Sequence, residues 1–262
     1  MAVAGSMVLL VWLLAGCGGT KEEATTPPTT AASAAPQDFS GPGPYAAGVT
    51  RLATSSGQPV NVFYPADRAA IPASAAAFVY HPEDTLGPIA SVLPPGIASD
   101  VTVPDAWVDV PASTSGRFPL VVSSHGRGGT RFSQSSHFAH LASWGFVVAA
   151  VEHPSRDLQA RLGRKDVGTS DVVAVNEAIA LLDTQNGSTG LSRTGPDIQL
   201  AEDGCLPPDT PAEQIQAVWN HLDTAQLRWA FGIDPTVAEA SLQRPYLDAT
   251  FPGTIAEYQD VP

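Results

Sequence analysis

The sequence has few basic residues, and this scarcity excludes one broad class of function. Its 262 residues include 13 Lys and Arg against 26 Asp and Glu, so the formal net charge is −13 at pH 7. A nucleic-acid-binding protein needs a basic patch or stripe, and an anionic membrane would repel a body of this charge. The sequence therefore predicts no nucleic-acid partner.

Long regular or apolar stretches are also scarce. The 23 Gly and 24 Pro residues imply many turns and argue against a coiled coil or a helical bundle. Because 44% of the residues are hydrophobic and only 15% are charged, we expect a globular protein. The apolar run at residues 7–15 is too short to span a bilayer, but it has the length of a signal-peptide core.

Cysteine occurs only at Cys17 and Cys205. Residues 14–17, Leu-Ala-Gly-Cys, resemble the bacterial lipobox, in which a peptidase cleaves before the cysteine and the thiol receives a lipid. The resemblance implies a signal peptide at residues 1–16, a lipid anchor on Cys17 and export to the bacterial cell envelope. A lipidated Cys17 leaves Cys205 with no partner for an internal disulfide.

The alternative for this segment is an ordinary apolar N-terminus with a chance cysteine. Residues 1–6 contain no Lys or Arg, although signal peptides normally begin with positive charge. The following residues are rich in Thr, Ala, Pro, Ser and Gly, a composition that cannot bury a core. We therefore expect residues 17–44 to form a disordered tether that carries an acidic domain away from the membrane surface.

Strand and helix patterns then alternate over a predicted domain at residues 45–186. Apolar runs predict strands at 60–64, 118–124 and 146–151, with a Gly-rich turn at 125–129 and a polar loop at 152–157. Apolar residues at helical spacing predict a helix at 133–144, with Phe138, Leu141 and Ala142 on one face and Gly145 as its stop. A second helix is predicted at 170–186, with Val172, Val175, Ile179 and Leu182 on one face. Seven prolines favour loop structure over residues 70–116. The order of strand, turn, helix and strand implies an α/β fold with a doubly wound sheet whose strand 118–124 is buried on both faces.

The pattern changes over residues 187–262. Residues 210–213, Thr-Pro-Ala-Glu, form a capping box with Pro at the first helical position, and they predict a helix that ends before Gly232. Trp219 and Trp229 are expected in the core of this part. No buried strand is evident, so we expect a helical insertion or cap, or a disrupted region.

Three segments resemble a known family. Residues 118–126, Phe-Pro-Leu-Val-Val-Ser-Ser-His-Gly, are similar to the third strand and oxyanion turn of α/β-hydrolases. The resemblance is greatest to bacterial proteins related to platelet-activating factor acetylhydrolase, dienelactone hydrolase and the polyester-cleaving cutinases. Residues 43–49 with 63–66 resemble the N-terminal strands of that family, and residues 141–148 resemble its first helix and next strand. The resemblance implies the N-terminal part of an α/β-hydrolase-type sheet and hydrolysis of carboxylic esters, such as lipid acetyl esters or polyesters.

The Gly-rich turn suits this chemistry. Ester hydrolysis passes through a tetrahedral intermediate whose oxygen carries negative charge, and fixed backbone N–H groups stabilise that oxygen. The resemblance implies an oxyanion hole at Gly126 and Arg127, with the N–H of Arg127 as a donor. The alternative is an ordinary tight turn between a strand and a helix.

The sequence lacks the nucleophile motif of this fold. Hydrolases of the family carry their serine in Gly-x-Ser-x-Gly, and this pentapeptide occurs nowhere in the chain. The nearest match surrounds Ser192, without the final Gly and without a preceding strand, while Cys205 lacks both flanking glycines. After Ser192 the only histidine is His221, inside the predicted helix, so neither base nor acid is assigned. We expect a truncated or disrupted hydrolase whose sheet is incomplete at the C-terminal end.

The other histidines predict no metal site. His125 is expected to be a structural residue that packs at the strand end, and His153 a loop residue at the edge of the site. His137 and His140 lie three apart on a helix without a ligand pattern of cysteines or carboxylates. No cofactor is predicted. The alternatives to an esterase are a non-catalytic or truncated hydrolase-like lipoprotein that binds through the helix at 210–231, and a periplasmic solute-binding lipoprotein, for which no second lobe is evident.

Overall fold

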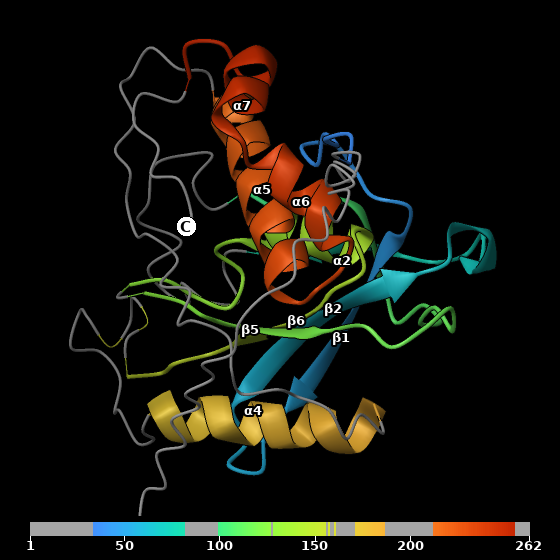
Figure 1. Ribbon diagram of the computed structural model, residues 1–262. Coiled ribbons are helices and arrows are strands. Elements are labelled where there is room, and N and C mark those ends of the chain that lie inside the picture. The colour runs from blue at the N-terminus through green and yellow to red at the C-terminus, as the bar shows by residue number, and fades with distance from the viewer. Residues whose placement is uncertain are drawn as a thin grey trace, which may run out of the picture. The chain divides into compact units, whose positions relative to one another are not determined.

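The computed structural model describes residues 34–81, 99–126, 128–155, 157, 160, 171–186 and 212–254. Within them the chain forms one sheet with helices on both faces, as Figure 1 shows. Its strands are β1 (Ala46–Ala53), β2 (Pro59–Ala66), β3 (Ala77–Tyr80), β4 (Val101–Val108), β5 (Leu120–Ser124) and β6 (Val147–Val151), and a short 3-10 helix, η1 (Arg68–Ala70), follows β2.

The six strands form a mixed sheet in the order β3-β4-β1-β2-β6-β5. β5 pairs with β6 in parallel, with Val121 opposite Val148. The pairs β1–β2, β2–β6 and β3–β4 are antiparallel, and β1–β4 is parallel. The predicted α/β fold is confirmed. The predicted pair of parallel strands is confirmed as well, although it belongs to a mixed sheet.

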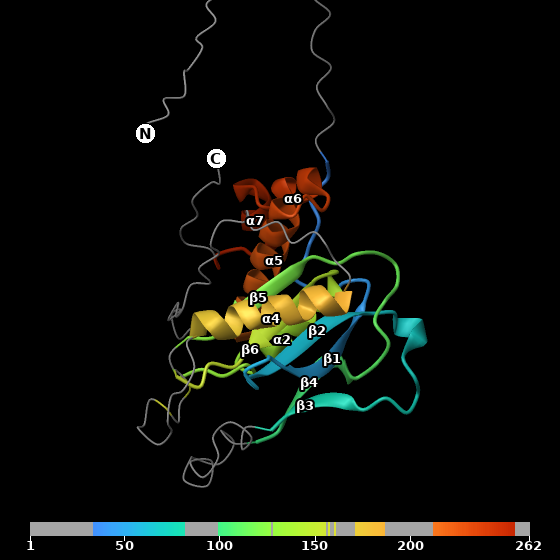
Figure 2. The same ribbon diagram turned by 90° about the horizontal axis from the view of Figure 1, so that it is seen from below.

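Helices α2 (Ser135–Ser143) and α4 (Asp171–Asn186) cover opposite faces of the sheet (Figures 1 and 2). Successive side chains of a strand point to opposite faces of the sheet, and here both faces are covered by helices. This arrangement explains why the sequence of β6 is apolar at every position. Val148 and Ala150 pack into the cluster that contains the α2 side chains, whereas Val147, Ala149 and Val151 pack into the cluster with α4. All five residues of β6 are buried.

The predicted loop at residues 70–116 is wrong in part, because it contains β3 and β4. Phe78, Val103 and Ala106 are buried there despite the nearby prolines. Pro104 is tolerated because the pairing of β4 is interrupted at that point. Thr102 pairs with β3, Ala106 pairs with β1, and Asp105 between them has a φ of 53°.

Two predicted burial patterns also need correction. β5 is only half-buried over most of its length, because it is the outermost described strand on its side of the sheet. On α4 the buried residues are Ala174, Ala178 and Leu182, one helical face at a spacing of four. The predicted face placed Val175 and Ile179 beside Leu182, but both are half-buried.

The boundaries of α2 agree with the sequence. Phe138, Leu141 and Ala142 form its buried face, as predicted. Gly145 follows the helix with a φ of +93°, a left-handed conformation that favours glycine and ends the helix before β6.

Helices α5 (Ala212–Ala230), α6 (Pro235–Ser241) and α7 (Arg244–Thr250) make up the described part of the predicted C-terminal region. α5 packs against α2 and α6, and α6 contacts α7. Trp219 is half-buried, but Trp229 is 38% exposed, so its predicted place in the core is wrong. None of the described helices is long and apolar enough to cross a membrane.

The described end of the predicted tether is packed rather than disordered. Phe39 is fully buried, with its ring edge-on to Trp144 at a centroid distance of 4.9 Å. The N–H of Phe39 donates to His221 Nδ1, and that of Gln37 donates to Ser241 Oγ. Phe39 and the hydrogen bond from Gln37 therefore attach this segment to the end of α2, to α5 and to α6.

Candidate active site at the ends of β5 and β6

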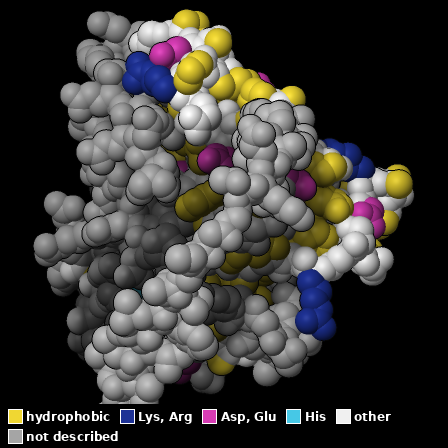
Figure 3. Space-filling view, viewed as in Figure 1, with side chains coloured by type: hydrophobic (Ala, Val, Ile, Leu, Met, Phe, Trp, Pro, Cys, Tyr) yellow, Lys and Arg dark blue, Asp and Glu magenta, His cyan; other side chains and the backbone are white. Residues whose placement is uncertain are grey.

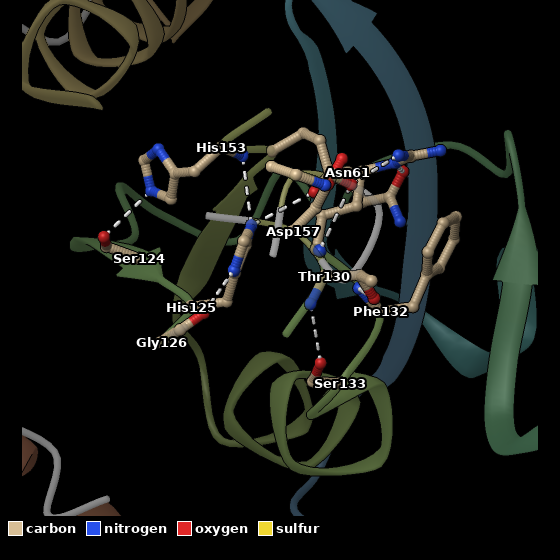
Figure 4. Close-up of polar contacts among 12 residues, drawn as sticks. Asn61, Ser124, His125, Gly126, Thr130, Phe132, Ser133, His153 and Asp157 are labelled. Carbon is tan, nitrogen blue, oxygen red and sulfur yellow. Dashed lines mark hydrogen bonds and ion pairs between the residues drawn. The ribbon is translucent and has the colours of Figure 1, made fainter. Parts of the chain in front are cut away.

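The polar residues of the candidate site follow two parallel strands. Because β5 and β6 are parallel and adjacent, their carboxyl ends meet at one edge of the sheet. Ser124, His125 and Gly126 stand at the end of β5, and His153 faces them from the segment after β6 (Figure 4). Glu152 is the first residue after β6.

The ring of His125 is bonded at both nitrogens. Its Nδ1 lies 2.9 Å from the carbonyl oxygen of Gly126, and its Nε2 accepts the backbone N–H of His153 at 3.0 Å. The Gly126 carbonyl also accepts the N–H of Gly129 at 3.1 Å. The predicted structural role of His125 at the strand end matches these contacts.

Ser124 and His153 form a second link between the strand ends. Ser124 Oγ lies 2.8 Å from Nε2 of His153, whose side chain is fully buried. The rings of His125 and His153 are 4.9 Å apart at an angle of 52°. The two strand ends are thus joined through both histidines.

A buried ion pair lies behind His125. Arg131 Nη1 lies 2.7 Å from Glu152 Oε2, and Glu152 Oε1 lies 3.1 Å from His125 Nε2. Burial alone would raise the pKa of Glu152, but hydrogen bonds and charge from His125 and Arg131 hold this pKa below its usual value. Arg131 also lies over the Phe132 ring at 4.2 Å, and its Nε contacts Asn61 Oδ1 on β2.

The glycines of the turn are needed for its backbone. Gly128 has a φ of +84°, which side-chain-bearing residues rarely adopt. A Cβ on Gly129 would lie 3.2 Å from the Cβ of His125 and 3.3 Å from the Gly126 oxygen. A larger residue at either position would therefore disturb the contact between His125 and the Gly126 carbonyl.

The residues predicted for the site are only partly within the described chain. Gly126 lies in the turn, but Arg127, Ser192, Cys17 and Cys205 lie outside the described residues. Their roles therefore remain predictions. His221 lies on α5, fully buried, where Nδ1 accepts from Phe39 and Nε2 donates to the carbonyl of Ser241 at 3.0 Å.

Another pair of histidines lies in a polar network between α2 and α5. His137 contacts Asn220 at 2.9 Å and Asp223 at 2.9 Å, and His140 contacts Thr224 at 3.2 Å. Among the described residues there is no group of three or more side chains arranged to hold a metal ion.

Sequence reasoning missed Glu152, Arg131 and Asn61. One available signal was the position of Glu152, a carboxylate directly after a fully apolar strand, at the edge where ligands bind in such sheets. Its partner Arg131 could not be found in this way, because the pair joins residues 21 positions apart. Asn61 occupies an interior position of β2, which the alternation of that strand did not mark.

The described part of the molecule also contains a cavity, and its basic side chains form no patch on the face shown. A cavity of about 260 Å³ is lined by the start of α2 and by Tyr80, Phe132 and Trp219. On the face shown in Figure 3, the described Arg side chains are scattered rather than gathered in a patch.

Comparison with known proteins identifies the relatives of this chain. The family model of platelet-activating factor acetylhydrolase, isoform II, matches residues 33–164. The platelet-activating factor acetylhydrolase of Canis lupus familiaris is 39% identical over 72 residues, which cover 28% of this chain and 16% of that protein. The enzymes of Cavia porcellus and Bos taurus are 47% and 45% identical over 53 residues, 20% of this chain and 12% of each relative.

The matched segments thus span less than a fifth of the length of these relatives. The family match nevertheless extends over half of the chain and begins before Phe39 and ends after His153. It includes the turn and the ion pair behind it. The chain therefore belongs to the family of platelet-activating factor acetylhydrolase, isoform II.

Proposed function

We propose that this protein acts in the hydrolysis of carboxylic esters, with lipid acetyl esters as the preferred substrate class. The observation that carries the proposal is the Gly-rich turn at the joined ends of β5 and β6, where His125 and Gly129 both bind the Gly126 carbonyl. Polyesters are the second substrate class to be tested.

In this reaction a serine attacks the acyl carbonyl, with a histidine as base and an acidic residue that orients it. The N–H of Arg127 is our proposed donor to the developing oxyanion, in the position that the family resemblance assigns to it. A donor of this kind contributes about 3 kcal/mol to the transition state. Because the chain contains no Gly-x-Ser-x-Gly, the nucleophile is either Ser192 in an unusual context or a serine outside these 262 residues.

Hydrolysis of p-nitrophenyl acetate and butyrate tests the proposal. The complete product of the reading frame, the 262-residue chain and its Ser192→Ala variant are compared. The proposal predicts serine-type activity, blocked by an organophosphate, in the complete product. Activity of the 262-residue chain that is lost in S192A would identify Ser192 as the nucleophile. Absence of ester hydrolysis in every form would refute the proposal.

We also propose that the protein is exported and attached to the bacterial cell envelope through a lipid on Cys17. The motif at residues 14–17 and the polar composition that follows it support this proposal. An anchored location would bring an esterase to lipid substrates. Lipid chains supply about 0.8 kcal/mol of membrane affinity per buried CH₂ group.

A second candidate function is ligand binding without catalysis. The cavity of about 260 Å³ supports it, because Trp219 and Gln216 of α5 form part of its wall together with Phe132. Fluorescence titration with a short-chain lipid ester distinguishes the two functions. Saturable quenching that disappears in Trp219→Leu, without any turnover by the complete product, would favour binding.

A further inference from the structure

We infer that the cavity at the start of α2 binds a small neutral carbonyl compound, such as a short-chain ester or ketone, with its aliphatic chain on the buried side. This cavity is the one considered for the second candidate function, so the inference rests on that proposal and names the class and orientation of its ligand. It follows from the positions of the apolar, polar and charged groups in the described part of the cavity wall.

The buried part of the wall, here called the floor, is apolar, whereas its exposed part, the rim, is polar. Val103 of β4 and Phe132 are only 1% and 2% exposed, and they form the floor. Ser133 and Ser136, on either side of the first residue of α2, are exposed at the rim. An aliphatic chain is stabilised where it leaves water, and a carbonyl oxygen where hydroxyl groups and water donate to it. The ligand that fits this cavity therefore places its chain on the floor and its carbonyl at the rim.

The described wall offers no charge to the part of the ligand that is buried. Its described residues include no Asp, Glu, Lys or Arg. The ring of His137 in the wall is engaged by α5, because Nδ1 lies 2.9 Å from Asn220 Oδ1 and Nε2 lies 2.9 Å from Asp223 Oδ2. A charge carried to the floor would lose its hydration without gaining a partner, which is costly. The wall therefore selects an uncharged chain.

Two aromatic rings of the wall are held in place before any ligand binds. The Phe132 ring stacks with the Tyr80 ring at 4.6 Å, and the guanidinium of Arg131 lies 4.2 Å from its centroid. Trp219 donates from Nε1 to Asp223 Oδ2 at 2.6 Å and stacks with His137 at 4.8 Å. Side chains that are already fixed lose little freedom on binding, so the cavity is preorganised.

The volume of the cavity limits the ligand to a small molecule. Sites for drug-sized ligands have volumes of about 300 to 1,000 Å³, and this cavity, at about 260 Å³, is smaller. A chain of a few carbons suits it, whereas the long chain of a membrane lipid does not.

Methyl ketones test the site, because they carry the carbonyl and the chain of an ester but are not hydrolysed. The full chain is titrated with 2-butanone, 2-pentanone and 2-hexanone, and binding is followed at the ¹H–¹⁵N signal of the Trp219 indole, assigned with Trp219→Phe. We expect saturable shifts and a Kd that falls about fourfold for each added CH₂ group that is buried. Levulinate, a methyl ketone whose chain ends in a carboxylate, should bind at least about tenfold more weakly than 2-pentanone.

Two substitutions that fill the cavity are compared with one that does not. Val103→Phe fills it from the floor, and Gln216→Trp fills it from the half-buried wall on α5. Val108→Phe is the control, because Val108 lies on the same strand as Val103 but outside the wall. We expect V103F and Q216W each to weaken the binding of 2-pentanone at least about tenfold, and V108F to match the parent protein. Q216W decides the test if V103F does not fold.

The outcomes separate this inference from the proposed functions. Absence of a saturable shift, equal binding by Q216W and V108F, or levulinate binding as tight as that of 2-pentanone would overturn the inference, whether or not esters are hydrolysed. If the ketones bind as expected and the complete product hydrolyses esters, the candidate function of binding without catalysis fails and the site stands.

Discussion

Arg131 Nη1 lies 2.7 Å from Glu152 Oε2 and joins the segment after the Gly-rich turn to the residue after β6. The pair is largely withdrawn from water, with side-chain exposures of 13% and 7%. Removal of one partner from a buried pair leaves an uncompensated charge, which is costly. Arg131 and Glu152 therefore stabilise the strand ends and the turn together.

Substitution of Arg131 tests this pair. Arg131→Met should lower the free energy of unfolding by about 3 kcal/mol, because Glu152 then stays buried without its guanidinium partner. The double variant with Glu152→Gln should lose less than the sum of the two single variants. Urea denaturation measures all three. Arg244→Met, in an exposed pair with Asp248, is the control and should lose less than about 1 kcal/mol. Similar losses for R131M and R244M would contradict the account.

Acid should weaken the contact between α2 and α5. Burial, and then the neighbouring His137, lower the pKa of His140 from 6.5 to about 4. The folded protein thus keeps His140 neutral while the unfolded chain already binds a proton. Stability from this residue is complete above pH 6.5, decreases as the pH falls, and is lost near pH 4, by up to about 3 kcal/mol.

His140→Gln isolates this effect, because the amide retains a partner for Thr224 but does not titrate in this range. Urea midpoints measured from pH 7 to pH 4 should decline less steeply in H140Q than in the parent protein. The lowered pKa of Glu152 adds a loss at lower pH in both proteins, so it cancels in the comparison. Parallel declines in the two proteins would show that His140 does not set the slope.

Phe39 should be essential to the attachment of the N-terminal segment. Phe39→Ala should cost about 3 to 5 kcal/mol of stability, because a fully buried ring between Trp144 and His221 is lost. Thermal and urea unfolding measure the loss. Phe231→Ala, at a ring 44% exposed, is the matched control and should cost less than about 1.5 kcal/mol. A small loss in F39A would mean that residues 37–43 contribute little to the fold.

The proposed lipid anchor predicts a change of location on substitution of Cys17. Cys17→Ser removes the thiol that would receive the lipid, so the protein should move from the detergent phase to the aqueous phase in a Triton X-114 partition. Incorporation of labelled palmitate should disappear at the same time. Cys205→Ser is the control and should remain with the detergent. Unchanged labelling in C17S would refute the anchor.

Local patterns predicted the elements that surround the turn. The apolar run before His125, the apolar face around Phe138 and the stop at Gly145 identified β5, α2 and the start of β6. These patterns depend only on residues close in sequence, so they can be recognised without knowledge of the long-range contacts of the fold. The family resemblance rested on the same stretch and agrees with the match to residues 33–164.

Long-range contacts explain what sequence reasoning missed. β4 contains Pro104, and a proline disfavours a strand because it lacks a backbone N–H. It is compatible with β4 because strand pairing is broken at that point, and this break is evident only in the folded sheet. Phe39 was assigned to a tether because its own neighbours are polar, whereas its partners Trp144 and His221 are more than a hundred positions away. The contact between Arg131 and Glu152 likewise depends on the folded sheet, because only there does the end of β6 lie beside the turn.

The most direct test of the central claim is the kcat for p-nitrophenyl butyrate in the complete product after substitution of Arg127. Arg127→Pro removes the backbone N–H proposed to bind the oxyanion, whereas Arg127→Ala removes the side chain and keeps that N–H. The account predicts a kcat at least about 100-fold lower in R127P than in R127A, at similar melting temperatures. An R127P variant that is folded and as fast as R127A would contradict it.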